Sequence, residues 1–435
     1  MTNPIVVVDV SVQSSAAPNL LLSQGAFISV GGTSLAAGTY ALLPQQSTLG
    51  TLVTPPAAIT SLTWSGGTVT ATTAAPHGIP AAATVEVSIA GAAPTGYNGT
   101  FLATYTGAST FTYPVALNPG SETTPGTWQP QTAVELVAMN TTYWAQNPPN
   151  ALVPPYVLEL GLESATNAVA SLGTFINASP QFFSRYLVPR EWTGNSAFLT
   201  FVALYAAANK LTYFHTSVTS SSYTTFAGQK AVVSCCEAPG IPATEFTAAA
   251  RFANELAANP NSSAPLSPLS YRYMFGVTTY PATGNAALLA ALATADVDYI
   301  GSGSQGGVSY QILQGGNNMD GNPFTFWYAS DWGVVNLQLD IGNALVNGSN
   351  NSANPLRFNQ QGINRLKAVA NNTLTRGVTF GCYSPGFTLT AVPFVTYQQQ
   401  NPGLVLEGIY NGFNAGVTPI PNFLQVVFNL QVFDI

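Results

Sequence analysis

The two histidines are the first candidates for chemistry, because a Ser-His-Asp site needs an imidazole as its general base. His77 lies in a Pro-His-Gly stretch that is typical of a turn, and His215 lies inside the β-rich run Leu211–Val218. No G-x-S-x-G or comparable nucleophile turn accompanies either residue. The sequence therefore predicts structural roles for both histidines.

Residues 301–306 read GSGSQG and match G-x-G-x-x-G, the phosphate-binding pattern of dinucleotide sites. In such a site the third glycine opens a helix whose N-terminus holds the pyrophosphate. Here the β-like run Val308–Leu313 follows instead and ends in Gly315-Gly316. We therefore expect a glycine-rich loop and no nucleotide site.

Asp296 and Asp298 flank Val297 in a predicted strand, so their carboxylates are expected on one face. Paired carboxylates can act in catalysis, hold a loop or form pairs between subunits, and the sequence leaves these choices open. Of the three cysteines, Cys235 and Cys236 are adjacent, which provides neither a disulfide framework nor zinc spacing. We expect reduced, buried thiols and no catalytic, cofactor-binding or metal site.

Composition limits the classes of partner. Only 6% of the 435 residues are charged, against about 25% in an average protein, and the net charge is −7. Nucleic acid is a poor partner, because phosphate binding needs clustered Lys and Arg. A surface so short of charge repels its own copies weakly, which favours ordered self-assembly. Residues 1–30 lack the basic start of a secretory signal, and no apolar run is long enough to span a bilayer.

Basic residues gather in one amphipathic stretch, Asn354–Pro385. Its apolar residues recur at three- to four-residue spacing, which predicts a helix over Phe358–Arg376. The stretch carries four of the ten basic residues: Arg357, Arg365, Lys367 and Arg376. The pattern is compatible with a contact to an acidic partner and equally with a solvated face.

The rest of the chain indicates an α/β protein with an all-β insert. Short strands with turn signals between them predict a small β module at 55–130, and from 131 onwards strands alternate with helices, which predicts a largely parallel sheet covered on both faces. The expected strands after 131 are Tyr156–Leu160, Leu211–Val218, Ala231–Cys235, Tyr271–Val277, Val297–Ile300, Phe387–Tyr397 and Gly403–Tyr410. The expected helices are Ser164–Ile176, Ala197–Asn209, Thr244–Ala258, Ala286–Thr294, Trp327–Val346 and Phe358–Arg376.

A β-rich run stands at each end of the chain. Asn3–Val12 precedes a polar connector, and Asn422–Phe433 alternates apolar and polar residues. Such strands can pair within their own subunit or add to the edge of a neighbour's sheet. The connector favours exchange, because a tethered strand can reach another copy. The residues expected in these arms are Ile5, Val6, Val8, Val10, Leu424, Val426, Phe428, Leu430 and Val432.

The chain resembles the sheath proteins of contractile bacteriophage tails. The resemblance is carried by PYVLELGLESATNAVASL, FTFWYASDWGVVNLQLDIGNAL and NQQGINRLKAVANNTLTRGVTFG, together with the order of α/β unit, two late helices and terminal β region. The stretch Thr68–Tyr113 is also similar to a small β module inserted in phage tail proteins. The resemblance implies a subtilisin-like α/β core without protease activity, extended strand arms, and no enzymatic function.

The resemblance also implies an organisation and a set of partners. It divides the chain into an N-terminal arm (1–20), a core (21–54 and 131–420), an inserted β domain (55–130) and a C-terminal arm (421–435). Within the core it places the α/β domain at about 131–330, the late helices at 327–377 and a β region at 378–420. The implied partners are other copies in sixfold rings, the tail tube, and baseplate and terminator proteins, with neither nucleic acid nor membrane insertion.

In a sheath the basic helix would face the tube, with Arg357, Arg365, Lys367 and Arg376 against acidic patches. Contraction would drive the tube through the host envelope, and the protein would be a virion component assembled in the host cytoplasm. A tube or baseplate protein is the structural alternative. An α/β hydrolase or nucleotide-binding enzyme is the remaining alternative, with His215 or the glycine-rich stretch in its site.

Overall fold

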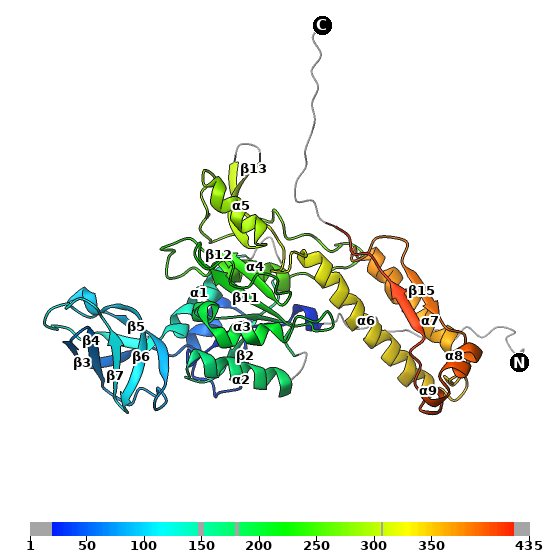
Figure 1. The fold of residues 1–435 in the computed structure, drawn as a ribbon, viewed down its shortest axis with the longest axis horizontal. Helices are drawn as coiled ribbons and strands as arrows, with labels where there is room; N and C mark the ends of the chain where they lie inside the picture. The colour runs from blue at the N-terminus through cyan, green and yellow to red at the C-terminus, as the bar shows by residue number, and fades with distance from the viewer. Residues whose placement is uncertain (1–19, 147–151, 179–181, 306–307, 422–435) are drawn as a thin grey trace, which may run out of the picture.

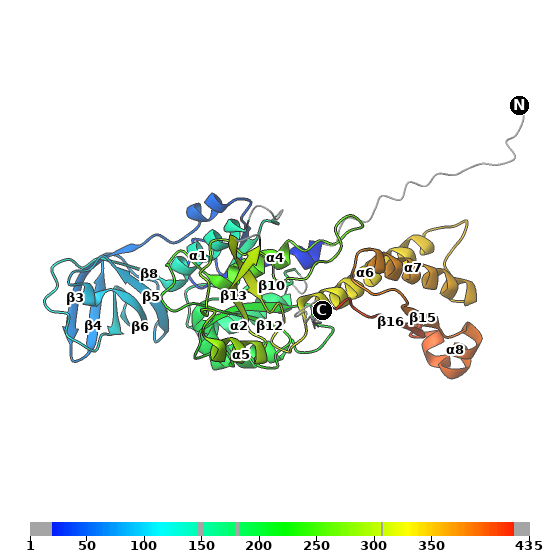
Figure 2. The ribbon, with the colours of Figure 1, turned by 90° about the horizontal axis from the view of Figure 1, so that it is seen from above.

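The computed structural model describes residues 20–146, 152–178, 182–305 and 308–421. A β-barrel, a central α/β unit and a C-terminal helical arm lie in a row along the longest axis (Figure 1). The view from above shows the same row (Figure 2), so the protein is elongated. The expected terminal strands, Ile5–Val10 and Leu424–Val432, lie outside the described residues.

The central unit contains an eight-stranded sheet with the order β14-β13-β12-β11-β10-β1-β9-β2. Neighbours from β13 to β9 pair in parallel, and the edge strands β14 and β2 are antiparallel. The predicted largely parallel sheet is thereby confirmed. The strands are β1 (Gly25–Ser29), β2 (Tyr40–Leu42), β9 (Tyr156–Glu159), β10 (Arg185–Leu187), β11 (Tyr213–Val218), β12 (Val232–Cys236), β13 (Asp298–Gln305) and β14 (Val308–Gln314).

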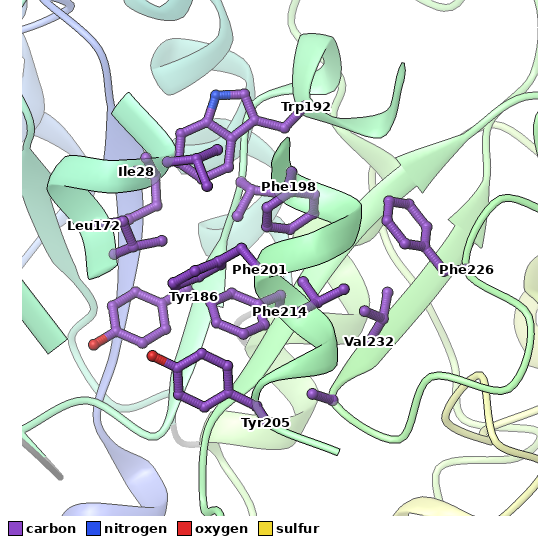
Figure 3. Close-up of a cluster of buried hydrophobic side chains, with 14 of the residues drawn as sticks. Ile28, Leu172, Tyr186, Trp192, Phe198, Phe201, Tyr205, Phe214, Phe226 and Val232 are labelled. Atoms are coloured by element: carbon purple, nitrogen blue, oxygen red, sulfur yellow. The ribbon is translucent and has the colours of Figure 1, made fainter. Parts of the chain in front are cut away.

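Helices cover both faces of the sheet because side chains of each strand point alternately to the two sides. In β1, Ile28 belongs to the core under α2 and α3, whereas Phe27 belongs to the core under α1 and α4. Figure 3 shows the first of these cores, where aromatic side chains from α3 and β11, including Phe198 and Phe214, meet edge to face. The helices are α1 (Gln131–Ala145), α2 (Ala165–Ala178), α3 (Ser196–Ala203), α4 (Thr247–Leu256) and α5 (Ala286–Thr294).

The predicted small β module is a closed six-stranded barrel with the order β3-β4-β7-β6-β5-β8. Its strands alternate between buried and exposed residues, and Val69, Phe111 and Trp128 fill its interior. The last barrel strand runs directly into α1, which also contacts β5. The strands are β3 (Ala57–Ser65), β4 (Thr68–Thr73), β5 (Thr84–Ala90), β6 (Gly99–Gly107), β7 (Thr110–Pro114) and β8 (Thr127–Pro130).

The C-terminal arm is built on two long helices, α6 (Phe324–Ser349) and α7 (Gln360–Thr379), which pack against each other. Both confirm the predicted late helices. Beside them lie a two-stranded antiparallel sheet, β15 (Thr388–Ala391) and β16 (Phe413–Gly416), and two short helices, α8 (Phe394–Gln400) and α9 (Pro402–Leu406). Trp332 and Tyr383 pack edge to face in the core between the helices and the chain that follows α7.

Three predicted strands are wrong or too long. The run at 271–277 forms only an isolated bridge with β14, because Tyr271 (φ 65°) and Gly276 (φ 64°) leave the extended conformation. The run at 387–397 is a strand only to Ala391, because Pro393 precedes helix α8. The run at 403–410 contains helix α9, which Pro402 begins, as the fixed φ of proline allows at a first helical position.

Other boundaries also differ from the prediction. The helix expected over 197–209 ends at Ala203. The stretch Gly301–Gly306 is not a loop throughout, because β13 continues to Gln305. Helix α1 and strands β3, β8 and β10 were not predicted. The sequence at 185–187 is too short to show a period, so only the neighbouring strands reveal β10.

A buried charge network ties helix α4 to the sheet. Glu255 of α4 accepts hydrogen bonds from Nε of Arg185 and Nε of Arg251, both at 2.7 Å. Arg251 also pairs with Asp298 at the start of β13. All four side chains are at most 2% exposed. The two guanidinium groups keep the pKa of Glu255 well below its usual range despite burial, whereas burial raises the pKa of Asp298 to about 6.

Asp331 is a second buried acid, on α6. Its Oδ2 accepts a hydrogen bond from the Tyr213 hydroxyl at 2.8 Å, and Oδ1 has no partner among the described residues. Burial raises the pKa of Asp331 to about 7. At the barrel junction burial likewise raises the pKa of Glu135 to about 7, although Arg190 donates to it from its backbone N–H at 3.1 Å.

Replacing Glu255 by Gln should lower the free energy of unfolding by about 3–5 kcal/mol, because it leaves two buried arginines with one carboxylate fewer. Urea denaturation followed by circular dichroism measures the change. The matched control is Asp340→Asn, which breaks the partly exposed pair with Arg376 and should cost about 1 kcal/mol or less. Equal losses in the two variants would contradict the role given to the network.

Asp331→Asn should make stability less dependent on pH. A raised folded-state pKa means that the folded protein holds a proton which the unfolded chain releases above about pH 4, so stability falls as pH rises from about 4 through 7 and levels off above the folded-state pKa. The amide mimics the protonated acid and does not ionise. Compared with the parent, the variant should therefore gain stability between pH 5 and pH 8. Parallel curves of unfolding free energy against pH would show that Asp331 does not titrate in this range.

Candidate assembly surfaces

Helix α7 is positioned by the residue that caps its N-terminus and by one apolar face. The side chain of Asn359 caps the helix, accepting a hydrogen bond from the Gly362 N–H at 2.9 Å. Ile363, Ala370 and Leu374 are buried against the neighbouring elements. The amphipathic pattern in the sequence thus corresponds to a helix with one packed side, and its other sides are open to a partner.

Arg376 forms an ion pair within the protein. Its Nη2 lies 2.8 Å from Oδ2 of Asp340 on α6, and the Thr373 hydroxyl donates to the same oxygen at 2.6 Å. The guanidinium also lies 5.7 Å from the ring centre of Trp332. Arg376 therefore helps to hold α7 on α6, a contact that spacing along one helix could not reveal.

Arg357, Arg365 and Lys367 have no carboxylate within ion-pair distance in the part of the chain that the structure describes. Arg357 is exposed just before α7, and Arg365 donates to the backbone oxygen of Asn354 at 3.1 Å. Two residues along a helix turn by about 200°, so Arg365 and Lys367 lie on opposite flanks of the packed face. The structure therefore places Arg365 and Lys367 on one helix but on different faces, with Arg357 just before the helix.

The other basic residues show why this helix stands out. Arg185, Lys230 and Arg251 are buried, and Arg190 binds Glu237 at 2.8 Å. With Arg376 paired, six of the ten basic residues have no carboxylate within ion-pair distance in the described ranges: Lys210, Lys230, Arg272, Arg357, Arg365 and Lys367. Three of these six belong to α7 or the residues just before it, and a fourth, Lys230, is buried.

The chain after α7 forms a two-stranded ribbon with open edges. Beyond the β15–β16 pairing, Ser384 N–H donates to the Thr418 oxygen at 2.8 Å, and Tyr383 bridges Pro419. The ribbon therefore runs from residue 382 to 391 on one side and from 413 to 420 on the other. In the described part of the chain no strand pairs with its outer edges. Such edges accept added strands.

A partly open cavity of about 290 Å³ lies between this ribbon and α6. Val334 and Leu337 of α6, Leu374 of α7 and Tyr383 line it, and Ala415, Val417 and Pro419 contribute alternate side chains of the ribbon strand. Gly333 also lines the cavity and allows the Tyr383 hydroxyl to lie against α6, because a Cβ at position 333 would be 2.1 Å from that oxygen. Its lining contains no charged residue.

The residues considered for catalysis lie far from one another and have structural partners. His77 closes a barrel turn, with Nε2 2.7 Å from the Gly107 oxygen. His215 is fully buried on β11, where burial lowers its pKa, and Glu255 Oε2 lies 3.4 Å away. The sequence motif beginning at Gly301 opens no helix, since it lies in the β13–β14 hairpin.

Asp296 and Asp298 do not form a pair. Asp296 precedes the strand with φ 56° and binds Asn317 at 3.0 Å, whereas Asp298 pairs with Arg251. The shared face expected from strand alternation is therefore wrong, because the strand begins only at Asp298. Cys235 and Cys236 are free and buried, as predicted, and burial raises the pKa of Cys236 to about 12.

Within the described ranges, no group of three or more His, Cys, Asp or Glu side chains is placed to hold a metal ion. None of the helices described here is both long and apolar enough to cross a membrane. The candidate contact features of this region are the basic helix, the ribbon edges and the apolar cavity.

The architecture matches that of a chain in a solved baseplate structure. A chain of the anti-feeding prophage (AFP) baseplate, solved by cryo-electron microscopy with six-fold symmetrisation, superposes with a TM-score of 0.57 over 99% of both chains, at 10% sequence identity. The sheath tail protein Lin1278 from Listeria innocua gives a TM-score of 0.43 at 9% identity, covering 87% of this chain and 89% of that one. No protein-family model and no curated protein sequence matches the chain. The mixed α/β fold is thus shared, end to end, with a chain of the AFP baseplate.

Proposed function

We propose that this protein is a structural subunit of a contractile tail, of the sheath type, and has no enzymatic activity. The shared fold with the AFP baseplate chain carries the proposal, because it extends over 99% of both chains. At 10% identity that match concerns the fold, and the function rests on its agreement with the sequence resemblance and the surfaces described above.

Subunits are proposed to assemble into stacked rings, with six copies in each ring as in the symmetry of the AFP structure. The terminal arm strands, Ile5–Val10 and Leu424–Val432, would link the copies by adding to sheet edges. The ribbon of β15 and β16 supports this assignment, because its two edges are open among the described residues. Further proposed partners are the tail tube and the baseplate and terminator proteins.

The basic helix is proposed to face an acidic tail tube through Arg357, Arg365 and Lys367. Each exposed contact would contribute about 1 kcal/mol or less, and repetition around the tube would set the register. Weak contacts of this kind can also separate when the subunits move during contraction. Arg376 contributes indirectly, since its pairing with Asp340 holds α7 in place.

The finer assignments follow from the same proposal. The α/β core is proposed to be subtilisin-like, flanked by arms at 1–20 and 421–435 and carrying the inserted domain at 55–130. The protein would belong to the virion tail and assemble in the host cytoplasm. A baseplate subunit is the second candidate, since the matching chain itself comes from a baseplate. A sheath subunit should form long polymers alone, whereas a baseplate subunit should not.

Deleting residues 1–12 should leave a folded monomer that cannot polymerise, because the arm that links neighbouring copies is removed. Sedimentation and negative-stain microscopy measure assembly, and circular dichroism checks the fold. The full chain under the same conditions is the control and should form tubes. Normal tubes from the shortened chain would rule out a linking role for this arm, and absence of tubes from the full chain would favour the baseplate candidate.

Reversing charge at Arg365 and Lys367 to Glu should yield free tail tubes without extended sheaths, because the acidic tube would repel the altered helix. Electron microscopy of particles assembled with the variant counts the tubes that carry an extended sheath and those that do not. Lys210→Glu changes an exposed lysine on the α/β unit and is the control. If the double variant covers tubes as well as the control does, the helix is not the tube contact.

A further inference from the structure

The cavity and the ribbon strand beside it form one surface. Ala415, Val417 and Pro419 line the cavity at every second position, so one face of this strand looks into it. The outer edge of the same strand is open within the described residues. A third strand laid along this edge would place its own alternate side chains over the cavity, as in recognition by strand addition.

The chain itself supplies a candidate segment for this position. The described residues end at Pro421, two positions after the cavity residue Pro419, and fourteen residues follow. Residues 422–433 contain no charged residue, which suits a cavity with an uncharged lining. A covalent tether raises the effective concentration of the segment at the cavity into the millimolar range.

The sequence alternation selects a register. If Pro421 and Asn422 form a two-residue turn, Ile420 lies opposite Phe423. In this register the residue numbers of any two opposed residues sum to 843. Pro and Asn are common turn residues. Paired residues point to the same face, which puts Leu424, Val426 and Phe428 opposite Pro419, Val417 and Ala415. A turn one residue longer would instead present Gln425 and Asn429 to the apolar cavity.

We propose that in the unassembled subunit the C-terminal segment 422–435 folds back as a third strand on residues 413–420, with Leu424, Val426 and Phe428 covering the cavity. The segment then shields a strand edge that would otherwise bind other copies. In the assembled particle the same segment must leave this position before it can join a neighbour. The fold-back itself does not depend on the proposed tail function, because it concerns the free chain.

A disulfide between paired positions tests the register. In the full chain at low concentration, Val417→Cys with Val426→Cys should cross-link within one molecule under mild oxidation. The matched control, Val417→Cys with Val427→Cys, moves the second cysteine to the opposite face of the strand. The native cysteines Cys235, Cys236 and Cys382 are all buried, so they do not compete. Non-reducing electrophoresis separates monomers from dimers, and mass spectrometry after alkylation counts free thiols.

The proposal requires a cross-linked monomer in the first variant. The yield of cross-linked monomer in the control should be several-fold lower. A predominantly cross-linked dimer would mean that the segment lies on another copy, and equal yields would mean that no register exists; either result overturns the proposal. Ala415→Trp, which fills the cavity, should lower the monomer cross-link several-fold, whereas Asn414→Trp on the other face should not. The pair Ala415→Cys with Phe428→Cys repeats the test if the first variant does not fold.

Discussion

The rest of the structure depends on the buried pairing of Glu255 with Arg185 and Arg251. Burying a charged group away from water costs free energy unless the group is paired and hydrogen-bonded. Here one carboxylate on α4 binds two guanidinium groups, and Arg251 continues to Asp298 on β13. These ion pairs hold helix α4 against the sheet. The same arginines contact the start of α6. The Cζ atoms of Arg185 and Arg251 lie 5.7 Å and 6.0 Å from the ring centre of Phe324.

This network also shapes the surface. The chain has only ten basic residues, and those in the interior or in ion pairs are unavailable to partners. What remains exposed is dominated by uncharged polar and apolar groups, with a small group of positive charges at α7. A protein of this kind meets other copies without much electrostatic repulsion, and specificity has to come from strand edges and shape. Both are provided by the C-terminal ribbon and the cavity under it.

Much of the fold could be predicted because hydrophobic periodicity reports which face of a segment is buried. The barrel strands at 68–73 and 84–90, helix α5 and the two late helices were all visible in this way. Prediction failed where a backbone feature overrides the pattern, as at Tyr271 with its positive φ, or where a proline starts a helix, as at Pro402. It also failed for β10, whose three residues acquire their role only between β1 and β11.

By itself the sequence determined the class of the protein: scarce charge, an all-β insert in an α/β chain, and a single basic amphipathic helix. These follow from composition and local period, which neighbours in space do not alter. Only the tertiary structure decided what individual groups do. It paired Arg376 with Asp340, separated Asp296 from Asp298, and created the cavity beside the ribbon. Such outcomes depend on contacts between residues far apart in the chain, and a linear pattern does not encode their distances.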